Sequence, residues 1–301
     1  MRARRCFRGK VGVLIQRGLS NAGLPTIRPP ELACLCSLFR PYMPDIKLSV
    51  TLITRNESRH IAACLKSVAF ADEWVVVDSG STDDTREIAA SLGARVVKTD
   101  DWPGFGMQKN RALELARGRW VLSIDADERV SEALATQIQA AIKNEQAADG
   151  YELSRISRFC GQWIRHGDWY PDRVLRLFRR ESGRFTNDLV HERLQVNGRV
   201  DRLAGDLLHD TMPTLDDALD KMNRYSSGRA LDKVAAGRSG GLGAALAHGL
   251  WAFVRCYGLK CGFLDGRLGF VLAIYVAEGT YYRYLKMGLL TQQARNPIEP
   301  I

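Results

Sequence analysis

The 301-residue sequence lacks the glycine-rich loops with which the commonest nucleotide-binding proteins hold phosphate. No Gly-x-Gly-x-x-Gly segment follows a predicted strand, which argues against a dinucleotide-binding Rossmann site. The absence of a Gly-Lys-Ser/Thr loop likewise excludes P-loop hydrolysis of nucleotides. There is also no low-complexity tract and no internal repeat, and the composition is that of a folded protein. Any bound phosphate would therefore have to be held by side chains and a metal ion.

Long hydrophobic runs and paired cysteines are also missing. The stretches 239–254 and 268–277 contain no Lys, Arg, Asp or Glu, but their 16 and ten residues fall short of the ~18–20 that cross a bilayer. The seven cysteines are odd in number and irregularly spaced, which favours reduced thiols and a cytosolic setting. Cys34 and Cys36 have no second pair beside them, so we predict no zinc site. The basic N-terminus carries no convincing secretory signal.

The net charge of +9 lies in the two ends of the chain. Residues 1–45 carry eight Lys and Arg against two acids, residues 238–301 carry seven against three, and residues 46–237 are close to neutral. Basic ends around a neutral centre favour an anionic membrane surface over nucleic acid as a partner. Residues 1–45 show no periodicity, so we predict a poorly ordered extension, with Met43 as a possible start. A catalytic domain is expected over 46–237, followed by a helical membrane-associating region over 238–301.

Four short apolar stretches in the expected catalytic domain alternate with helical patterns. This alternation predicts a parallel, doubly wound α/β sheet, in which ligands bind at the carboxyl ends of the strands. Asn56, Asp78 and Asp125 each follow one of these strands, so we expect the three side chains to converge. The predicted strands are Leu48–Ile53, Trp74–Val77, Arg95–Val97 and Trp120–Ile124.

The strand that ends at Ile124 runs directly into an Asp-Ala-Asp-Glu segment. Because side chains alternate along an extended chain, Asp125 and Asp127 should point the same way. Two carboxylates at the end of a buried strand are unfavourable unless a cation lies beside them. Oxygen ligands suit a hard divalent ion such as Mg²⁺ or Mn²⁺, which can in turn hold a diphosphate. The alternative is a turn that starts a helix, with the acids placed at its N-terminus.

Four segments of the sequence are distinctive in this order. They are Leu48-Ser-Val-Thr-Leu-Ile-Thr-Arg-Asn-Glu57, Val77-Asp-Ser-Gly-Ser-Thr-Asp-Asp-Thr85, Gly106-Met-Gln-Lys-Asn-Arg111 and Ile124-Asp-Ala-Asp-Glu128. Together they resemble the family-2 glycosyltransferases. Within that family, residues 46–290 are most similar to the branch that adds β-linked glucose to heptose in the inner core of lipopolysaccharide. The resemblance implies a GT-A fold, an inverting mechanism, a nucleotide-sugar donor (UDP-glucose favoured) and a divalent metal, Mg²⁺ or Mn²⁺.

The resemblance also assigns roles on the donor side. Asp78 matches the residue that holds the nucleobase, and Asp125 matches one near the ribose and the metal. Asp127 matches the metal ligand that bridges to the diphosphate. Lys109 lies where a basic side chain approaches the nucleotide, although a solvated helix face would place a lysine there equally well. The first loop should touch the nucleoside through Thr54, Asn56 and Glu57.

Inversion needs a general base that takes the proton of the acceptor hydroxyl. The resemblance places a Val-His-Glu triplet here, and we predict Glu192 as the base in preference to Asp188. Many relatives carry a Glu-Asp pair at this point, so the two carboxylates remain alternatives. His191 could join the metal or orient the acceptor, or it could be a structural histidine bonded to the backbone.

A basic and aromatic segment between these motifs is the expected acceptor side. Residues 155–184 contain eight arginines as well as tryptophans, and arginine binds phosphate and carboxylate bidentately while aromatic faces stack on sugars. Nucleic acid could use the same patch, but we expect none, and alternation over residues 173–178 would leave several arginines solvated. The predicted acceptor-binding residues are Trp163, Arg165, Trp169, Asp172, Arg173 and Arg176.

The C-terminal part is expected to be helical and to lie on a membrane surface. A helix should start at Thr214, and the two later apolar stretches are flanked by Arg255, Lys260 and Arg267. Docking onto the catalytic domain is the alternative for these helices. We therefore predict a peripheral enzyme on the cytoplasmic face of the inner membrane, which transfers a hexose to a lipid-linked anionic oligosaccharide. Three alternatives are a family-2 enzyme that acts on another lipid-linked or cell-surface glycan, a nucleotide-sugar pyrophosphorylase and a non-catalytic membrane- or RNA-binding module.

Overall fold

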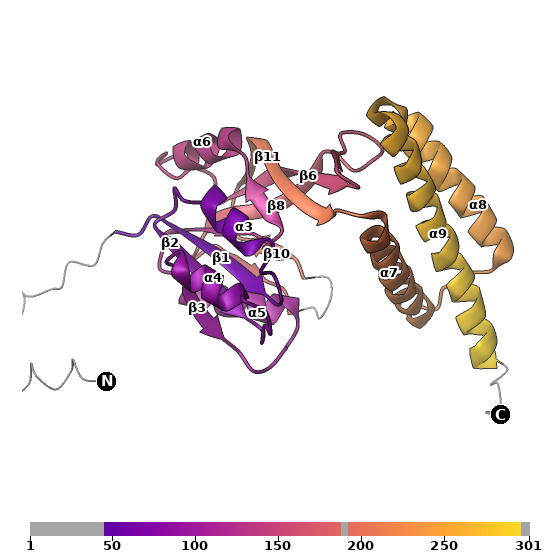
Figure 1. Cartoon of the computed structure of the whole chain (residues 1–301), viewed down its shortest axis with the longest axis horizontal. Coiled ribbons are helices and arrows are strands. Elements are labelled where there is room, and N and C mark those ends of the chain that lie inside the picture. The colour runs from indigo at the N-terminus through magenta and orange to yellow at the C-terminus, as the bar shows by residue number, and fades with distance from the viewer. Residues whose placement is uncertain (1–44, 188–191, 296–301) are drawn as a thin grey trace, which may run out of the picture. The chain divides into compact units, whose positions relative to one another are not determined.

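The computed structural model describes residues 45–187 and 192–295, and its first half is a parallel sheet. The strands β1 (Leu48–Thr54), β2 (Glu73–Asp78), β3 (Arg95–Lys98) and β4 (Trp120–Ser123) lie in the order β3-β2-β1-β4 (Figure 1). All three pairings are parallel, and Thr54 at the end of β1 lies opposite Asp78 at the end of β2. The predicted strands are confirmed with ends shifted by one residue at most.

Helices cover both faces of this parallel region, as the doubly wound class requires. In β2, Val76 belongs to the core that also contains Ile61 and Leu65 of the helix α3 (Ile61–Ser67). Val75 and Val77 point the other way, towards Ala112 of α5 (Phe105–Leu115). Both faces of β2 are therefore buried, which explains its unbroken run of valines. The remaining helices of this part are α4 (Thr85–Ser91) and α6 (Glu132–Ala141), and Ser131 caps α6 by accepting from the N–H of Leu134.

The second half of the sheet adds antiparallel pairings that the sequence does not predict. Strand β4 pairs antiparallel with β8 (Asp172–Arg179), and β8 pairs antiparallel with β6 (Gly150–Phe159). Next to β6 come β11 (Val200–Met212), which is parallel to it, and then β5 (Glu128–Val130). The short β7 (Gln162–Trp163) pairs with β6, while β9 (Gly183–Phe185) and β10 (Leu194–Val196) form a separate hairpin. The protein thus has an α/β fold whose parallel half meets its mixed half at β4.

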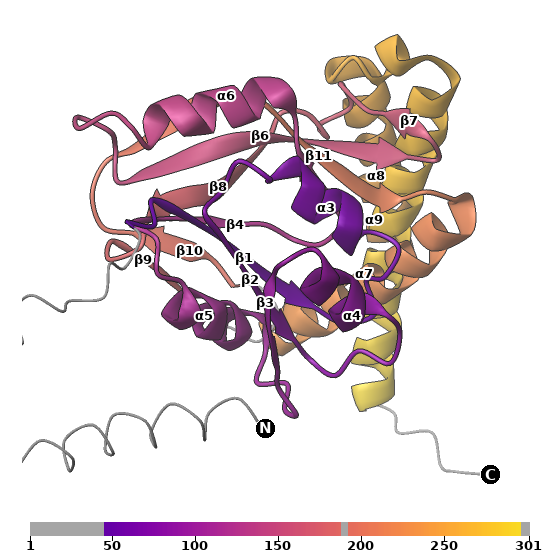
Figure 2. The ribbon, with the colours of Figure 1, turned by 60° about the vertical axis from the view of Figure 1, so that its left-hand side comes forward.

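Three long helices follow the sheet (Figure 2). The first, α7 (Leu215–Ala235), begins at Thr214 as predicted, because Thr214 and Asp217 form a reciprocal capping box. The helix α8 (Leu242–Phe253) continues through a π-helical turn (Val254–Leu259) and a 3₁₀ turn (Gly262–Asp265) into α9 (Gly266–Arg295). Lys286 of α9 ties the helices together by donating to α7 at Asn223 Oδ1 (2.8 Å). Within the described residues, no helix combines the length and the apolar character needed to cross a bilayer.

The predicted division of the chain stays a prediction. The basic extension over 1–45 lies outside the described residues except for its last residue. The expected boundary at residue 237 falls in the connection between α7 and α8, although α7 packs against α9. Judged by packing, α7 therefore belongs with α8 and α9, so the helical part begins at α7.

Candidate active site

The carboxyl ends of β1 and β2 meet through a buried carboxylate. Asp78 accepts hydrogen bonds from the Thr54 hydroxyl (3.0 Å) and from the N–H groups of Gly80 and Ser81 (3.1 and 2.9 Å). The Ser81 hydroxyl donates to it as well. Asp78 is fully buried, and both of its carboxylate oxygens are engaged by the protein. The ends of β1 and β2 meet here as predicted, whereas the convergence of Asp125 with Asn56 and Asp78 stays a prediction.

Asn56 and Glu57 in the loop after β1 were both predicted to touch the nucleoside, but their side chains have different surroundings. Asn56 adopts a left-handed backbone conformation (φ 58°), and its side-chain oxygen accepts from the N–H of Thr82 (2.8 Å), so it joins the loops after β1 and β2. Glu57 instead lines the cavity over the sheet edge. Burial and the charges of Asp127, Asp125 and Asp83 raise the pKa of Glu57 to about 7. Glu57, Asp125 and Asp127 line the same cavity, so the negative charges of the two aspartates oppose ionisation of Glu57.

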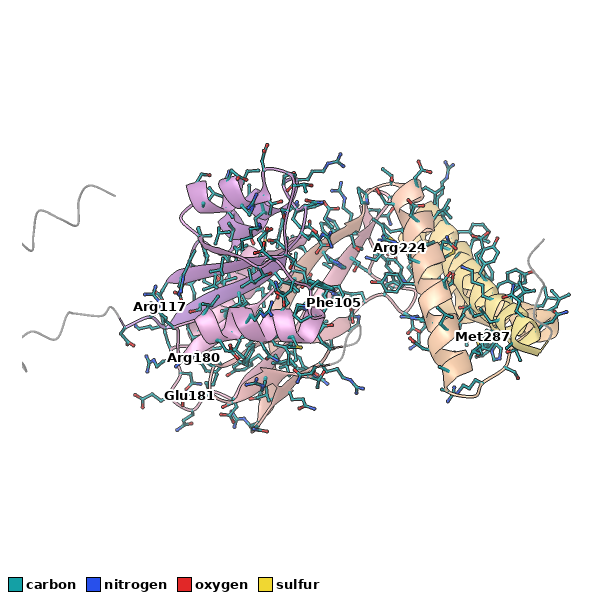
Figure 3. The ribbon with its side chains drawn as sticks, turned by 90° about the horizontal axis from the view of Figure 1, so that it is seen from below. Phe105, Arg117, Arg180, Glu181, Arg224 and Met287 are labelled. Atoms are coloured by element: carbon teal, nitrogen blue, oxygen red, sulfur yellow. The ribbon has the colours of Figure 1, made fainter. Side chains whose placement is uncertain are left out.

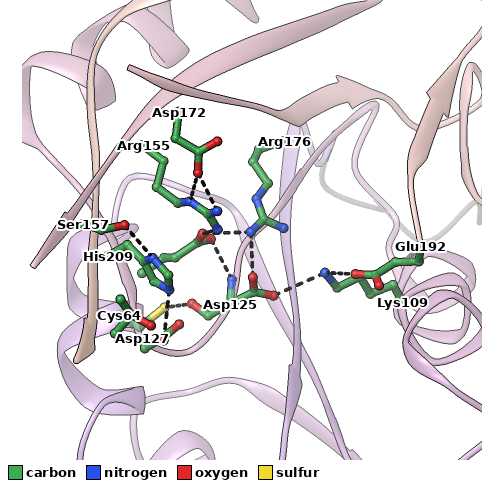
Figure 4. A network of polar contacts seen from close by, with 12 residues as sticks. Cys64, Lys109, Asp125, Asp127, Arg155, Ser157, Asp172, Arg176, Glu192 and His209 are labelled. Atoms are coloured by element: carbon green, nitrogen blue, oxygen red, sulfur yellow. Dashed lines mark hydrogen bonds and ion pairs between the residues drawn. The ribbon is translucent and has the colours of Figure 1, made fainter. Parts of the chain in front are cut away.

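The loop after β4 is anchored by Glu128, the third carboxylate of the Asp-Ala-Asp-Glu segment. Figure 4 shows the surrounding polar network, with Asp125, Arg155 and Arg176 labelled. Glu128 is fully buried and accepts from the N–H of Asp125 (3.0 Å). It also accepts from the guanidinium groups of Arg176 (2.8 Å) and Arg155 (3.2 Å). Each oxygen of this buried charge therefore has a partner, as burial demands. Glu128 was not among the predicted site residues, although it directly follows them in the sequence.

Arg176 was predicted to bind the acceptor, but it is buried beside Asp125 and Glu128. Its Nη2 donates to Asp125 Oδ2 at 2.6 Å as well as to Glu128, and the residue is only 7% exposed. Burial opposes ionisation of Asp125, but Arg176 and Lys109 outweigh it and hold the pKa of Asp125 well below its usual range. Asp172, the other acidic member of the predicted acceptor set, is bound within the same network by Arg155 (2.6 Å).

Lys109 connects the donor-side carboxylates with the predicted base. Its Nζ lies 2.8 Å from Glu192 Oε1 and 3.3 Å from Asp125 Oδ1. The lysine is buried, so the alternative of a solvated helix face is wrong. Asp188 and His191, the other two residues predicted near the base, lie outside the described residues.

The helix that carries Lys109 is clamped to the hairpin beside Glu192. Asn110 donates to the carbonyl of Phe185 (2.9 Å) and accepts from its N–H (3.0 Å). A Cβ atom on Gly106 would lie 1.8 Å from the Thr186 carbonyl oxygen, so only glycine allows α5 to approach this closely. The Gly106–Asn110 segment therefore sets the distance between β4 and the predicted base.

On the other side of the loop, Asp127 faces a histidine that the sequence analysis missed. His209 Nε2 on β11 lies 3.2 Å from Asp127 Oδ2, and His209 Nδ1 lies 3.1 Å from the Ser157 hydroxyl. Burial raises the pKa of Asp127, but the hydrogen bond and charge of His209 outweigh it, so the net pKa is lowered. A lone histidine within a strand gave no sequence signal for this contact.

Asp127 and His209 would offer a carboxylate oxygen and an imidazole nitrogen to a divalent metal. As the structure stands, His209 Nε2 is hydrogen-bonded to Asp127 Oδ2, so a bound ion would replace the proton between these two atoms. Among residues 45–187 and 192–295, no group of three or more His, Cys, Asp or Glu side chains forms a complete set of metal ligands. An ion held here would complete its shell with phosphate oxygens and water, as Mg²⁺ typically does.

A cavity of about 1050 Å³ opens above these groups, a size typical of ligand sites. Asp125, Asp127 and His209 line one side, and residues of α7 and α9 line the other. Phe105 and Arg224, both labelled in Figure 3, belong to the lining. Of the residues predicted to bind the acceptor, Trp169 lines this cavity, whereas the described side chains of Trp163, Arg165 and Arg173 do not.

The comparisons with known proteins agree with this geometry. Residues 49–197 match the sequence model of Glycosyl transferase family 2. The chain is 31% identical to the lipopolysaccharide core biosynthesis glycosyltransferase LpsC of Rhizobium meliloti, over 80% of this chain and 94% of that protein. It is 30% identical to an uncharacterized glycosyltransferase of Rickettsia typhi, over 84% of this chain and 90% of that protein. The chain therefore belongs to glycosyltransferase family 2, and its α/β fold is of the GT-A class.

Among solved structures, the chain resembles residues 1–349 of Staphylococcus aureus TarS in complex with UDP. The sequence identity is 17%, the TM-score is 0.45, and the match covers 85% of this chain and 94% of that chain.

Proposed function

We propose that this family-2 glycosyltransferase moves a hexose, glucose from UDP-glucose, onto a heptose of the lipopolysaccharide inner core with inversion. The relationship to LpsC supports the class of acceptor, and the branch resemblance of the motifs supports the donor. The observation that carries the proposal is the position of Asp125 and Asp127. They follow β4 at the point where the strand order β3-β2-β1-β4 reverses, which is where open α/β sheets bind nucleotides.

On the donor side, Asp127 and His209 would hold a divalent metal, Mg²⁺ or Mn²⁺. When bound, such an ion neutralises the charge that develops on the departing diphosphate. Asp125 is fixed by Arg176 and Lys109, and in this proposal it lies near the ribose and the metal. Thr54, Asn56 and Asp78 form the rigid loops on which the nucleoside would rest.

On the acceptor side, Glu192 is the general base. Its Oε1 accepts from Lys109, which leaves Oε2 for the proton of the acceptor hydroxyl. The hydroxyl oxygen attacks the anomeric carbon as Glu192 takes this proton. The bond between that carbon and the diphosphate oxygen breaks on the opposite face, and the diphosphate leaves with the bonding electrons. Attack and departure on opposite faces invert the anomeric configuration.

Nucleotide-dependent thermal stabilisation tests the donor site. UDP with Mn²⁺ should raise the melting temperature of the protein, whereas GDP, CDP and dTDP should not. At ~100 Kd the gain is about 2.7 kcal/mol, or roughly 5–10 °C for a domain of this size. The variant His209→Ala should keep its fold and lose most of the Mn²⁺-dependent rise in melting temperature. As a control, His248→Ala should retain the full effect, because His248 stacks on Tyr284 and does not line the cavity.

Two results would overturn parts of this proposal. A full Mn²⁺-dependent shift in His209→Ala would remove the metal assignment. A shift with another nucleotide in place of UDP would keep the transferase mechanism and replace the proposed donor.

We also propose that the helical part binds an anionic membrane surface, on the cytoplasmic side where nucleotide sugars are made. On α8, Leu242, Leu246 and Leu250 recur at every turn and are 58%, 57% and 68% exposed. Arg255 and Lys260 follow on the same segment and are exposed too, and together they share one carboxylate, Asp168 (2.7 and 3.3 Å). An exposed apolar stripe beside cationic side chains is typical of helices that lie in the membrane interface.

Cosedimentation with vesicles that contain anionic lipids tests the membrane proposal. Leu246→Glu/Leu250→Glu should weaken vesicle binding at least tenfold, because each buried leucine contributes about 1.5–3 kcal/mol. Leu231→Glu is the control, since Leu231 is similarly exposed but lies on α7. Equal binding by all three proteins would contradict insertion of this stripe.

A further inference from the structure

The arginines that the sequence offered for the acceptor are largely neutralised within the protein. Among residues 155–184, every arginine except Arg173 lies within 4.0 Å of a carboxylate. Arg173 itself donates to the Ser154 hydroxyl. An anionic acceptor would have to compete with these internal partners. The cationic surface that it requires must therefore be sought elsewhere.

Four cations without such partners line the cavity wall that faces Asp125 and Asp127. They are Lys221, Arg224 and Arg229 of α7 and Arg283 of α9. In the described part of the chain, no ion pair to a carboxylate within 4.0 Å involves any of the four. The Nε atom of Arg283 is moreover buried and has no hydrogen-bond partner. This wall is thus a set of charges with unused hydrogen-bonding capacity.

The cations of α7 form a row along the helix that starts near Asp127. Lys221 interacts electrostatically with Asp127, and its ammonium group donates to the Thr211 hydroxyl. From Lys221 to Arg229 the helix rises by about 12 Å, at 1.5 Å per residue. A row of this length is longer than a diphosphate needs and suits an extended ligand with several charged groups.

The composition of the wall indicates what kind of ligand it would take. Arginine forks bind phosphate and carboxylate groups bidentately, and tyrosine and tryptophan faces suit sugar rings. Tyr225, Tyr275 and Trp169 line the same cavity. The acids on this wall are Asp217, which is bonded to Thr214 in the cap of α7, and Asp220, so cations outnumber acids.

We infer that Lys221, Arg224, Arg229 and Arg283 form the site that binds the phosphate or carboxylate groups of the glycan acceptor. This inference rests on the proposed function, because it takes the acceptor to be an anionic glycan. It moves the acceptor contact from the segment 155–184 to the wall built by α7 and α9. The reacting hydroxyl would then lie between this wall and Glu192.

A double variant tests the site. Arg224→Ala/Arg229→Ala is compared with Arg199→Ala/Arg202→Ala, which loses the same charge from β11 and its preceding turn, away from the cavity lining. The acceptor probe is a phosphorylated, acidic core oligosaccharide freed of lipid. Each lost charged contact is worth about tenfold in affinity, so KM for this probe should rise at least tenfold in the first variant. KM in the second variant and the Kd of UDP with Mn²⁺ in both should stay unchanged.

Two further probes identify the anionic group and its source. If phosphate is the recognised group, the dephosphorylated oligosaccharide should bind wild type and the double variant equally weakly, whereas carboxylate recognition would keep the difference. An equal loss of UDP affinity in Arg224→Ala/Arg229→Ala would show that the row serves the donor diphosphate and would overturn the inference. Loss of binding to anionic vesicles with an unchanged KM would assign the row to lipid headgroups and overturn it as well.

The outcome also separates this inference from the proposed function. If the wild-type protein forms no glycoside with the core oligosaccharide, the proposed acceptor is wrong. Direct binding of the same oligosaccharide by calorimetry then decides the site alone. Binding that is lost in Arg224→Ala/Arg229→Ala and kept in Arg199→Ala/Arg202→Ala supports it, and absence of binding by the wild type overturns it.

Discussion

Replacement of Glu192 by glutamine is expected to lower kcat by about 10² to 10⁴, the usual contribution of a general base. Glutamine keeps an oxygen that can accept the hydrogen bond from Lys109, so the contact at 2.8 Å should survive. What is lost is the ability to take the proton of the acceptor hydroxyl. Steady-state kinetics should therefore show a fall in kcat, while UDP binding in the presence of Mn²⁺ stays at the wild-type level.

Two further variants make this result specific. Glu181→Gln removes a carboxylate whose side chain is 91% exposed in the turn after β8, and it should leave kcat unchanged. Asp188→Asn tests the alternative base named from the sequence. If Glu192→Gln stayed active and Asp188→Asn were inactive, the assignment of the base would move to Asp188.

Replacement of Arg176 by methionine is expected to destabilise the protein by about 3–5 kcal/mol, because the buried Glu128 loses one of its two cationic partners and keeps only Arg155. Arg176 Nη2 contacts both Asp125 and Glu128, and Glu128 is fully buried. For a domain of this size the loss corresponds to a melting temperature lower by roughly 6–20 °C. Thermal unfolding followed by circular dichroism measures it. Glycosyl transfer should fall too, since the loop that carries Asp125 loses its support.

Arg173→Met is the matched control on the same strand. Arg173 is exposed, and its partner is the Ser154 hydroxyl, so its removal should cost no more than about 0.5 kcal/mol. Arg176→Lys should recover only part of the stability, because an ammonium group cannot reproduce the planar fork of arginine. Equal stabilities of Arg173→Met and Arg176→Met would show that the network around Glu128 contributes little.

The parallel half of the fold could be predicted because its signals are local. A short apolar run followed by a polar turn is enough to place a strand and its carboxyl end, as the β1 and β2 ends at Thr54 and Asp78 show. The start of α7 was equally readable, since Thr214 and Asp217 form their cap within four residues. The Asp-Ala-Asp segment was found for the same reason.

The side chains that hold Asp125 and Asp127 could not be predicted from local sequence patterns, because they come from strands distant in the sequence. Arg176 and His209 lie on β8 and β11, and they reach the loop after β4 only through the antiparallel pairings of the second half of the sheet. The alternating pattern over residues 173–178 predicted that several arginines are solvated, and Arg176 was predicted to bind the acceptor. Arg176 is buried instead, because both faces of β8 are covered at that position. The local hydrophobic pattern of a strand does not show which strands lie beside it in a mixed sheet.

The clamp between α5 and the β9 hairpin has a consequence for how such enzymes can diverge. Gly106 allows the close approach, Asn110 fixes the backbone of Phe185, and Lys109 touches carboxylates on both sides. A substitution in this short segment would shift the loop after β4 and the proposed base, Glu192, together. Changes of donor preference and of acceptor preference are therefore mechanically linked here, and lineages that alter one should be under selection to adjust the other.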